Sequence, residues 1–150
     1  MEILNKDYRD ILQCLLKEKV DFLIVGAYAM AAYGFPRATK DLDIWIFANP
    51  ENAERIFRAL KKFGAPMEKF ELSDFSKEGL VIQIGVSPCR VDILTQIDGV
   101  VFEKAFSEKV EVNLDGLKIP IISRKHLLKN KKVSGRPQDL VDITLLKKRR

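Results

Sequence analysis

The sequence predicts an α+β domain with α/β character, in which helices pack on a mixed β-sheet. Short apolar runs of strand length alternate along the chain with longer amphipathic segments. Glycine or proline stands at many of the boundaries between them. In chain order the segments give α-β-α-β-α-β-β-α-β-β-α-α, which indicates one sheet with helices packed on it.

Helix ends in the first half of the chain are marked by residues with specific backbone roles. Asn49 followed by Pro50 predicts an N-cap and a first helical position, and Gly64 predicts the end of that helix. Gly34 and Pro36 predict the end of an earlier, shorter helix. The predicted elements are a helix over 3–16, a strand over 22–25, a helix over 27–33, a strand over 41–47 and a helix over 51–63.

The second half contains two predicted strand pairs and three predicted helices. Ser123 predicts a helix N-cap and Pro137 opens the last helix, and residues 65–77 show no clean period, which predicts a loop with a short strand or turn. Apolar side chains at Leu127, Leu128, Leu140, Ile143 and Leu146 predict two helices that pack on the body. The predicted elements are strands over 80–86 and 89–95 joined by Ser87-Pro88, a helix over 100–106, strands over 110–112 and 117–122 around Asp115-Gly116, and helices over 125–132 and 138–148.

Length and composition describe a soluble globular protein. The 150 residues predict one domain, 1–150, with a basic helical segment at 123–150. No apolar stretch approaches the length needed to cross a bilayer, and the polar N-terminus lacks the apolar core of a signal peptide, so a cytoplasmic location and no membrane partner are expected. Cys14 and Cys89 have no metal-site spacing and are expected to be free thiols.

Positive charge is concentrated at the C-terminal end. Ten Lys or Arg side chains lie between Arg124 and Arg150 against Asp139 and Asp142, which gives +8, while the rest of the chain has 16 basic and 19 acidic residues, or −3. Such a segment suits contact with a triphosphate or a nucleic acid, and it also suits a solvated helix face with a frayed end. For residues 147–150 the solvated end is the favoured interpretation.

Three acidic residues in apolar strands form the most informative pattern. Side chains two apart in a strand point to the same face, so Asp41 and Asp43 present carboxylates roughly 7 Å apart at the backbone. Asp92 interrupts a later apolar run. Carboxylates on one face of neighbouring strands suit Mg²⁺, and a pair of such ions holds the attacking and leaving oxygens of a phosphoryl or nucleotidyl transfer. A solvated strand edge is the simpler alternative.

Gly26 ends the first strand and opens the helix that follows. Unpaired N–H groups at a helix start favour negative charge, and glycine lets a phosphate approach the backbone closely. A tight turn is the commoner reason for such a glycine. The spacing to the carboxylates strengthens the phosphate interpretation, because thirteen residues separate Val25-Gly26-Ala27 from Asp41-Leu42-Asp43-Ile44.

These motifs together resemble the DNA polymerase beta-like nucleotidyltransferase superfamily. Gly34 to Lys40, Asn130-Lys131-Lys132 and the region from Gly135 to Asp142 also resemble small prokaryotic nucleotidyltransferases, some of which belong to abortive-infection and toxin-antitoxin systems. The resemblance covers residues 22–146 approximately. It implies the nucleotidyltransferase fold, Mg²⁺ or Mn²⁺ as cofactor and an NTP such as ATP as substrate.

The resemblance also assigns roles to residues. Gly26 and Ala27 match a Gly-Gly or Gly-Ser pair that contacts the nucleotide phosphates, and Ala27 lacks the hydroxyl of that pattern. Asp41 and Asp43 match two metal-ligating catalytic carboxylates. Asp92 matches the third, which assists a metal or accepts the proton of the attacking hydroxyl. Lys131 matches a phosphate-facing position.

Other candidates are less specific. Arg37, Thr39 and Lys40 precede the carboxylate strand and are candidate phosphate contacts, although Arg37 is equally suited to pairing with nearby acids. Trp45 lies on the carboxylate side of its strand, where a base could stack, but an aromatic side chain in a central strand is usually core. His126, the only histidine, has no partner motif, so catalysis by it is not expected.

Three functions follow from these patterns. The first is an active nucleotidyltransferase that moves NMP from an NTP to a hydroxyl and releases pyrophosphate. The second is an inactive nucleotide- or RNA-binding module, which Ala27 and the small size keep open. The third is a toxin-antitoxin interaction partner. The sequence leaves the acceptor open among tRNA, a protein side chain and a small molecule.

Overall fold

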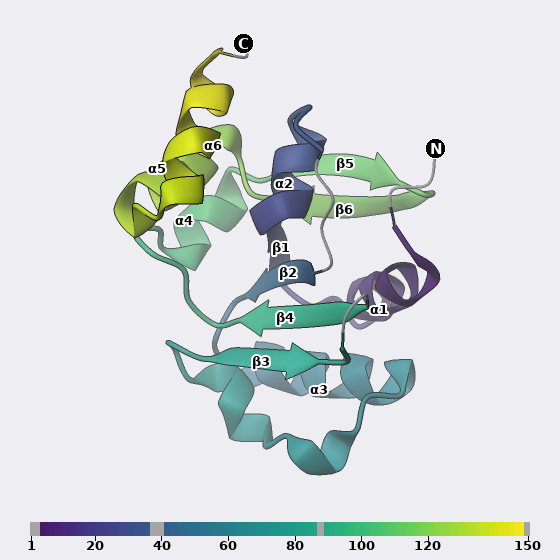
Figure 1. The fold of residues 1–150 in the computed structure, drawn as a ribbon. Coiled ribbons are helices and arrows are strands. Elements are labelled where there is room, and N and C mark those ends of the chain that lie inside the picture. Colours follow the sequence, from purple (N-terminus) through teal and green to yellow (C-terminus); the bar gives the residue numbers. More distant parts are fainter. Residues whose placement is uncertain (1–3, 37–40, 87–88, 149–150) are drawn as a thin grey trace.

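One six-stranded mixed sheet carries the helices of the protein (Figure 1). The computed structural model describes residues 4–36, 41–86 and 89–148. The strands lie in the order β3-β4-β2-β1-β6-β5. Their bounds, with those of the helices and two 3₁₀ turns, are α1 Lys6–Lys17, β1 Phe22–Val25, α2 Gly26–Ala32, β2 Asp41–Ile46, α3 Pro50–Phe63, η1 Met67–Lys69, η2 Leu72–Ser76, β3 Val81–Ile84, β4 Arg90–Leu94, α4 Phe102–Ser107, β5 Val110–Leu114, β6 Leu117–Ile121, α5 Arg124–Ser134 and α6 Pro137–Lys148.

The predicted fold class and element order are confirmed. β1 pairs antiparallel with β2 and parallel with β6, and β2 pairs parallel with β4. The two predicted strand pairs, β3 with β4 and β5 with β6, are antiparallel, which completes a mixed sheet. Among the described residues, no helix is both long enough and apolar enough to cross a membrane.

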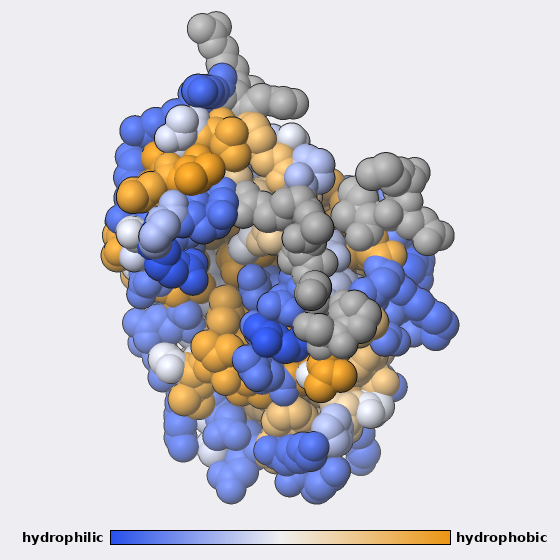
Figure 2. All heavy atoms as spheres, in the orientation of Figure 1, coloured by the Kyte–Doolittle hydropathy of each residue, from blue (hydrophilic) through white to orange (hydrophobic). Residues whose placement is uncertain are grey.

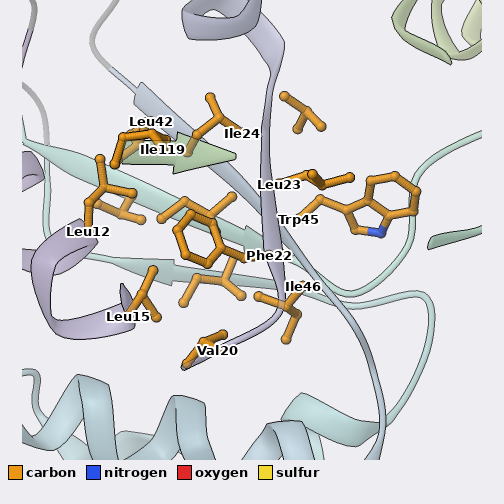
Figure 3. Packing of buried hydrophobic residues seen from close by; sticks show 14 of the residues in the cluster. Leu12, Leu15, Val20, Phe22, Leu23, Ile24, Leu42, Trp45, Ile46 and Ile119 are labelled. Carbon is orange, nitrogen blue, oxygen red and sulfur yellow. The ribbon is translucent and has the colours of Figure 1, made fainter. Parts of the chain in front are cut away.

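The core forms where the central strands meet α1 and α3. All four residues of β1 are buried, as expected for a strand covered on both faces. Figure 3 shows Phe22 of β1 between Leu12 and Leu15 of α1 on one side and Ile46 of β2 on the other. α1 and α3 therefore cover one face of the sheet, while α2 crosses the other face (Figure 1). The acidic side chains of β2 alternate away from this core.

Capping residues set most helix ends where the sequence predicts them. The Asn49 side chain accepts from the backbone N–H of Asn52 at 2.8 Å, and Gly64 ends α3 with φ +97°. The Ser123 hydroxyl accepts from the N–H of His126 at 3.2 Å and opens α5. Asp115 and Gly116 form the β5–β6 turn with φ of +51° and +83°, so this predicted hairpin turn is confirmed.

Most predicted elements begin or end within a few residues of the observed ones, and the first two helices and residues 65–77 show the clearest differences. α1 begins at Lys6 rather than at residue 3, because the Asn5 side chain accepts from the N–H of Tyr8 and caps the helix there. α2 begins at Gly26 instead of Ala27. Residues 65–77 contain two 3₁₀ turns and no strand, and the buried Phe75 anchors them to the core. The predicted Ser87-Pro88 connection lies outside the described residues.

α6 buries charge and exposes apolar side chains. Its most buried residues are Asp139, Asp142 and Leu146. Leu140 was expected to pack on the body, but it is 57% exposed, and Val141 beside it is 54% exposed. Figure 2 shows apolar side chains gathered over this helix.

A buried lysine explains the unexpected rotation of α6. Lys131 Nζ of α5 lies 2.8 Å from Asp142 Oδ2 and 3.5 Å from Asp139 Oδ1. Buried charges are tolerated only when they are paired, so both carboxylates of α6 must face α5. The ion pairs thereby fix which face of α6 points inward; the predicted burial of Leu146 is confirmed, and that of Leu140 is wrong.

The ion cluster of Lys131, Asp139 and Asp142 generates a stability prediction. Lys131→Met removes the ammonium that the two buried carboxylates share, although Asp139 keeps its ion pair with Arg136, so urea unfolding is expected to show a loss of about 3 kcal/mol. Lys132→Met, at the adjacent exposed position, is the matched control and is expected to change stability by less than about 0.5 kcal/mol. Equal losses in the two variants would contradict the structural role of Lys131.

Candidate active site

Three carboxylates from two parallel strands share one pocket. In the register of β2 with β4, Asp43 lies directly beside Asp92, and Asp41 lies beside Arg90. Asp41, Asp43 and Asp92 line a pocket of about 490 Å³ together with Gly26. The structure thus brings together the three acidic residues that the sequence selects.

Gly26 allows the backbone to pass directly over one of these carboxylates. The antiparallel register places Val25 beside Asp43, so the chain crosses Asp43 as it turns into α2. Gly26 has φ +68°, and a Cβ built on it would overlap Asp43 Oδ2. Both the left-handed backbone and the close approach require glycine at this position.

Arg90 bridges two of the three carboxylates. Its Nη2 lies 2.9 Å from Asp41 Oδ2 and 3.0 Å from Asp92 Oδ2. Residues 90 and 92 lie two apart on β4, so both side chains point to the face that carries the β2 carboxylates. The guanidinium balances part of the negative charge that the strand register gathers at one place.

The ionised form of Asp43 is destabilised by its surroundings. Burial, together with the charges of Asp92 and Asp41, raises its pKa from 3.8 to about 6, and the positive charges of Arg90 and Arg136 oppose this rise. A raised carboxyl pKa means that the folded protein holds the ionised form of Asp43 less well than water does. A further cation beside Asp43 would relieve this penalty.

The donor set fits Mg²⁺. Carboxylate oxygens are the ligands this ion prefers, and Asp92 Oδ1 is buried without a hydrogen-bond partner among the described residues. Within residues 4–36, 41–86 and 89–148, no three His, Cys, Asp or Glu side chains are already arranged to hold a metal ion. Because Arg90 holds Oδ2 of Asp41 and Oδ2 of Asp92, these two oxygens can contact a metal ion only after the guanidinium moves aside.

The opposite wall of the pocket comes from α5, the turn after it and the turn that follows β4. Asn130 donates to the Asp98 carbonyl at 3.0 Å, and the Ser134 hydroxyl donates to the Asp98 carboxylate at 3.0 Å. A Cβ on Gly99 would lie 2.5 Å from Val133, so this turn also fits closely against α5. These contacts hold the helical segment against the sheet at the edge of the pocket.

The two basic residues among the described pocket lining differ in how exposed their charged groups are. Lys131 lines the pocket, but its ammonium is buried between Asp139 and Asp142. Arg136 also lines the pocket, and its Nε lies 2.8 Å from Asp139 while its side chain stays 74% exposed. Arg136 is therefore the described pocket cation with the most open access to an anionic ligand.

The remaining predicted site residues lie elsewhere. Ala27 follows Gly26 in α2 but is not part of the pocket lining. Trp45 is 1% exposed and packs edge-on against Phe102, so the core interpretation is confirmed. His126 is buried outside the carboxylate pocket, and burial lowers its pKa. The predicted phosphate contacts Arg37, Thr39 and Lys40 lie outside the described residues.

The sequence patterns did not indicate the roles of Arg90 and Asp98, or that Arg136 is exposed at the pocket. Arg90 had a usable signal, because it stands two residues before Asp92 in the same strand and must share its face. Asp98 had no such signal in the sequence, since it lies in the turn after β4 and is held at the pocket by contacts with α5.

A mixed sheet with acidic residues on neighbouring strands, beside a glycine at a strand-to-helix turn, defines a nucleotidyltransferase-type protein. Residues 4–149 match the family model described as "Nucleotidyl transferase of unknown function (DUF2204)", and the chain belongs to this family. The resemblance to the nucleotidyltransferase superfamily is therefore confirmed. No curated protein matches the sequence.

Solved structures show the same fold at low sequence identity. A candidate nucleotidyltransferase from Thermotoga maritima is 21% identical with a TM-score of 0.59, and the match covers 99% of this chain and 98% of that one. The lincosamide antibiotic adenylyltransferase LnuA, bound to lincomycin, is 20% identical with a TM-score of 0.59 and 98% coverage of both chains. ANT(2")-Ia, in complex with adenylyl-2"-tobramycin, is 11% identical with a TM-score of 0.59, covering 93% of this chain and 84% of that one.

The close approach of Gly26 to Asp43 is testable by substitution. Gly26→Ala is expected to displace the Asp43 carboxylate and abolish any rise in melting temperature caused by Mg²⁺ with NTP. Gly64→Ala is the matched control, because Gly64 also has positive φ but its Cβ would meet nothing within 4 Å. Both changes are expected to cost about 1 kcal/mol of backbone strain, measured by thermal melts. A ligand response retained in Gly26→Ala would contradict this role.

The raised pKa of Asp43 predicts how stability depends on pH. The folded protein binds this proton more tightly than the unfolded chain, so the group lowers stability as pH rises from about 4 to about 6. In metal-free buffer, Asp43→Asn is expected to stabilise the protein at pH 8 by about 2 kcal/mol. The gain should shrink toward pH 4. Chemical unfolding at several pH values measures the difference, and a gain independent of pH would contradict it.

Proposed function

We propose that this protein is a metal-dependent nucleotidyltransferase that moves NMP from an NTP to a hydroxyl and releases pyrophosphate. The observation that carries the proposal is the convergence of Asp41, Asp43 and Asp92 on one pocket beside Gly26. The polar pocket of about 490 Å³ is of a size that accommodates a small-molecule ligand. Membership of a nucleotidyl transferase family supports the reaction class.

Mg²⁺ or Mn²⁺ would be held by the carboxylates of Asp41, Asp43 and Asp92. When bound, the metal lowers the pKa of the attacking hydroxyl and neutralises charge on the triphosphate. The residues themselves supply negative charge, a shared face and fixed spacing, because β2 and β4 are adjacent parallel strands.

Asp92 is the group proposed to take up the proton that the acceptor hydroxyl loses. Asp92 is buried and has one oxygen without a partner among the described residues, so it is placed to accept the proton of the acceptor hydroxyl. The hydroxyl oxygen then forms a bond to the α-phosphorus as the bond to the bridging oxygen breaks. The electron pair leaves with pyrophosphate, and the proton resides on the Asp92 carboxylate.

Arg136 and the Gly26 backbone are the proposed phosphate contacts. Arg136 is exposed at the pocket and remains positively charged, which suits the oxygens of a triphosphate. Gly26 permits close approach of phosphate to the backbone, and Ala27 offers only its N–H. Lys131 acts in this proposal through its ion pairs, which hold α5 and α6 in place.

A small molecule with a hydroxyl group is the proposed acceptor. The structure of LnuA contains bound lincomycin, and that of ANT(2")-Ia is a complex with adenylyl-2"-tobramycin. Both proteins share this fold. The basic C-terminal segment is less available to RNA than its sequence charge indicates, because Lys131 is buried between Asp139 and Asp142. A tRNA or a protein acceptor is the alternative that the experiment below distinguishes.

One observation favours a second candidate, an inactive nucleotide-binding module. Arg90 occupies the space between Asp41 and Asp92 with distances of 2.9 and 3.0 Å. If the guanidinium stays there in the presence of Mg²⁺ and NTP, the carboxylates bind nucleotide without catalysing transfer.

Label transfer from an α-phosphate-labelled NTP tests the proposal. Purified protein is incubated with Mg²⁺, each labelled NTP and separate small-molecule, RNA and protein fractions of a cell extract. Label is expected in the small-molecule fraction, with release of pyrophosphate. Label in RNA or protein would show that a macromolecule is the acceptor in place of a small molecule. The absence of label in all fractions would favour the inactive module.

Variants identify the source of the activity. Asp43→Asn is expected to lower label transfer at least a hundredfold, because it removes one ligand charge from the metal site. Asp115→Asn, in the β5–β6 turn at the far edge of the sheet, is the control and is expected to retain transfer. Transfer that survives in Asp43→Asn would contradict the assignment of the carboxylates.

A further inference from the structure

A second, smaller pocket lies at the end of β2. It has a volume of about 110 Å³ and is lined by Trp45, Phe47 and Phe102 together with polar groups of Glu78 and Gln96. None of these five residues lines the carboxylate pocket. The pocket is therefore a separate feature of the same region of the sheet.

Trp45, which lines this pocket, carries an unsatisfied hydrogen-bond donor. Its side chain is 1% exposed, and its indole N–H has no acceptor among the described residues. Figure 3 shows the indole ring at the edge of the packed side chains, beyond Leu23 and Ile46. A buried donor without an acceptor costs about 1–3 kcal/mol, so a ligand that offers an acceptor atom gains binding energy here.

Aromatic rings form one wall of the pocket. Phe47 stacks on Phe102 with centroids 5.3 Å apart and an interplanar angle of 5°. Phe102 stacks in turn on Phe106 at 5.3 Å and 20°. Among the described rings, Phe47 ends this row and is only half-buried, so a flat ligand ring can extend the stack.

The size and polarity of the pocket suit the edge of a planar ring with hydrogen-bonding groups. The pocket, at about 110 Å³, is smaller than the apolar cavity of about 150 Å³ that binds benzene, so it takes part of a planar ring and excludes a whole nucleotide. Glu78 and Gln96 are exposed at the pocket, where a carboxylate accepts and an amide both donates and accepts. Nucleobases combine a stacking face with such donors and acceptors.

The pocket lies at nucleoside distance from the carboxylates. Trp45 follows Asp43 by two residues on the same face of β2, about 7 Å along the strand. Leu94 pairs with Trp45 in the register and lines the carboxylate pocket, so the two pockets are neighbours across this residue pair. A nucleotide with its α-phosphate at the carboxylates can direct its base toward Trp45.

We propose that the pocket of Trp45, Phe47 and Gln96 binds the base of the nucleotide substrate. The indole N–H of Trp45 donates to a ring nitrogen or carbonyl of the base, and Phe47 stacks on its face. This assignment rests on the proposed nucleotidyl transfer for its biological meaning. Binding of the base is nevertheless measurable without phosphates, metal or turnover.

Trp45 is the only tryptophan in the chain, so its fluorescence reports directly on this pocket. The native protein is titrated in EDTA with adenosine, guanosine, cytidine and uridine, using excitation at the red edge where nucleobases do not absorb. At least one nucleoside is expected to change the emission in a saturable way. Ribose 5-phosphate, which has no base, is expected to leave the emission unchanged.

Two matched variants separate the pocket from the rest of the aromatic row. Phe47→Leu removes the stacking wall and is expected to weaken nucleoside binding about tenfold. Phe106→Leu makes the same change in the same row, outside the pocket lining, and is expected to retain native affinity.

Clear outcomes overturn the assignment. Absence of any saturable change, an equal response to ribose 5-phosphate, or equal weakening by Phe47→Leu and Phe106→Leu would each refute a base pocket at Trp45. Failure of label transfer with nucleoside binding intact would refute the catalytic proposal alone. The two proposals therefore fail by different measurements.

Discussion

Repulsion among three carboxylates is the constraint on which the rest of this structure depends. The parallel register of β2 and β4 places Asp43 beside Asp92, and strand periodicity adds Asp41 on the same face. Arg90 bridges two of the three side chains, and the third, Asp43, has a raised pKa of about 6. Such an arrangement is costly for a folded protein and a cation would relieve that cost, which is why we associate it with function.

The scaffold around these carboxylates is correspondingly rigid. β1 is buried on both faces, and Gly26 at its end passes so close to Asp43 that no side chain fits there. On the opposite wall, Lys131 joins α5 to α6 through two buried ion pairs, and Asp98 joins α5 to the turn after β4. Core packing therefore fixes one side of the pocket and polar contacts fix the other.

The sheet also relates the two pockets to each other. Asp43 and Trp45 alternate on one face of β2, so the carboxylates and the indole N–H have a spacing set by the strand itself. A substrate that bridges them would be positioned by backbone geometry, with little dependence on flexible side chains. The stacked rings of Phe47, Phe102 and Phe106 then hold the far pocket in shape.

The sequence by itself determined the fold class, the order of elements and the acidic residues, because these depend on local periodicity and capping. Asn49, Ser123 and Gly64 act within a few residues of their own position, and their roles are visible in the sequence. Only the tertiary structure decided the inward face of α6, the bridging role of Arg90 and the pocket beside Trp45. Those features arise from partners on different elements of the fold, since local periodicity specifies neither a buried ion pair nor a strand register.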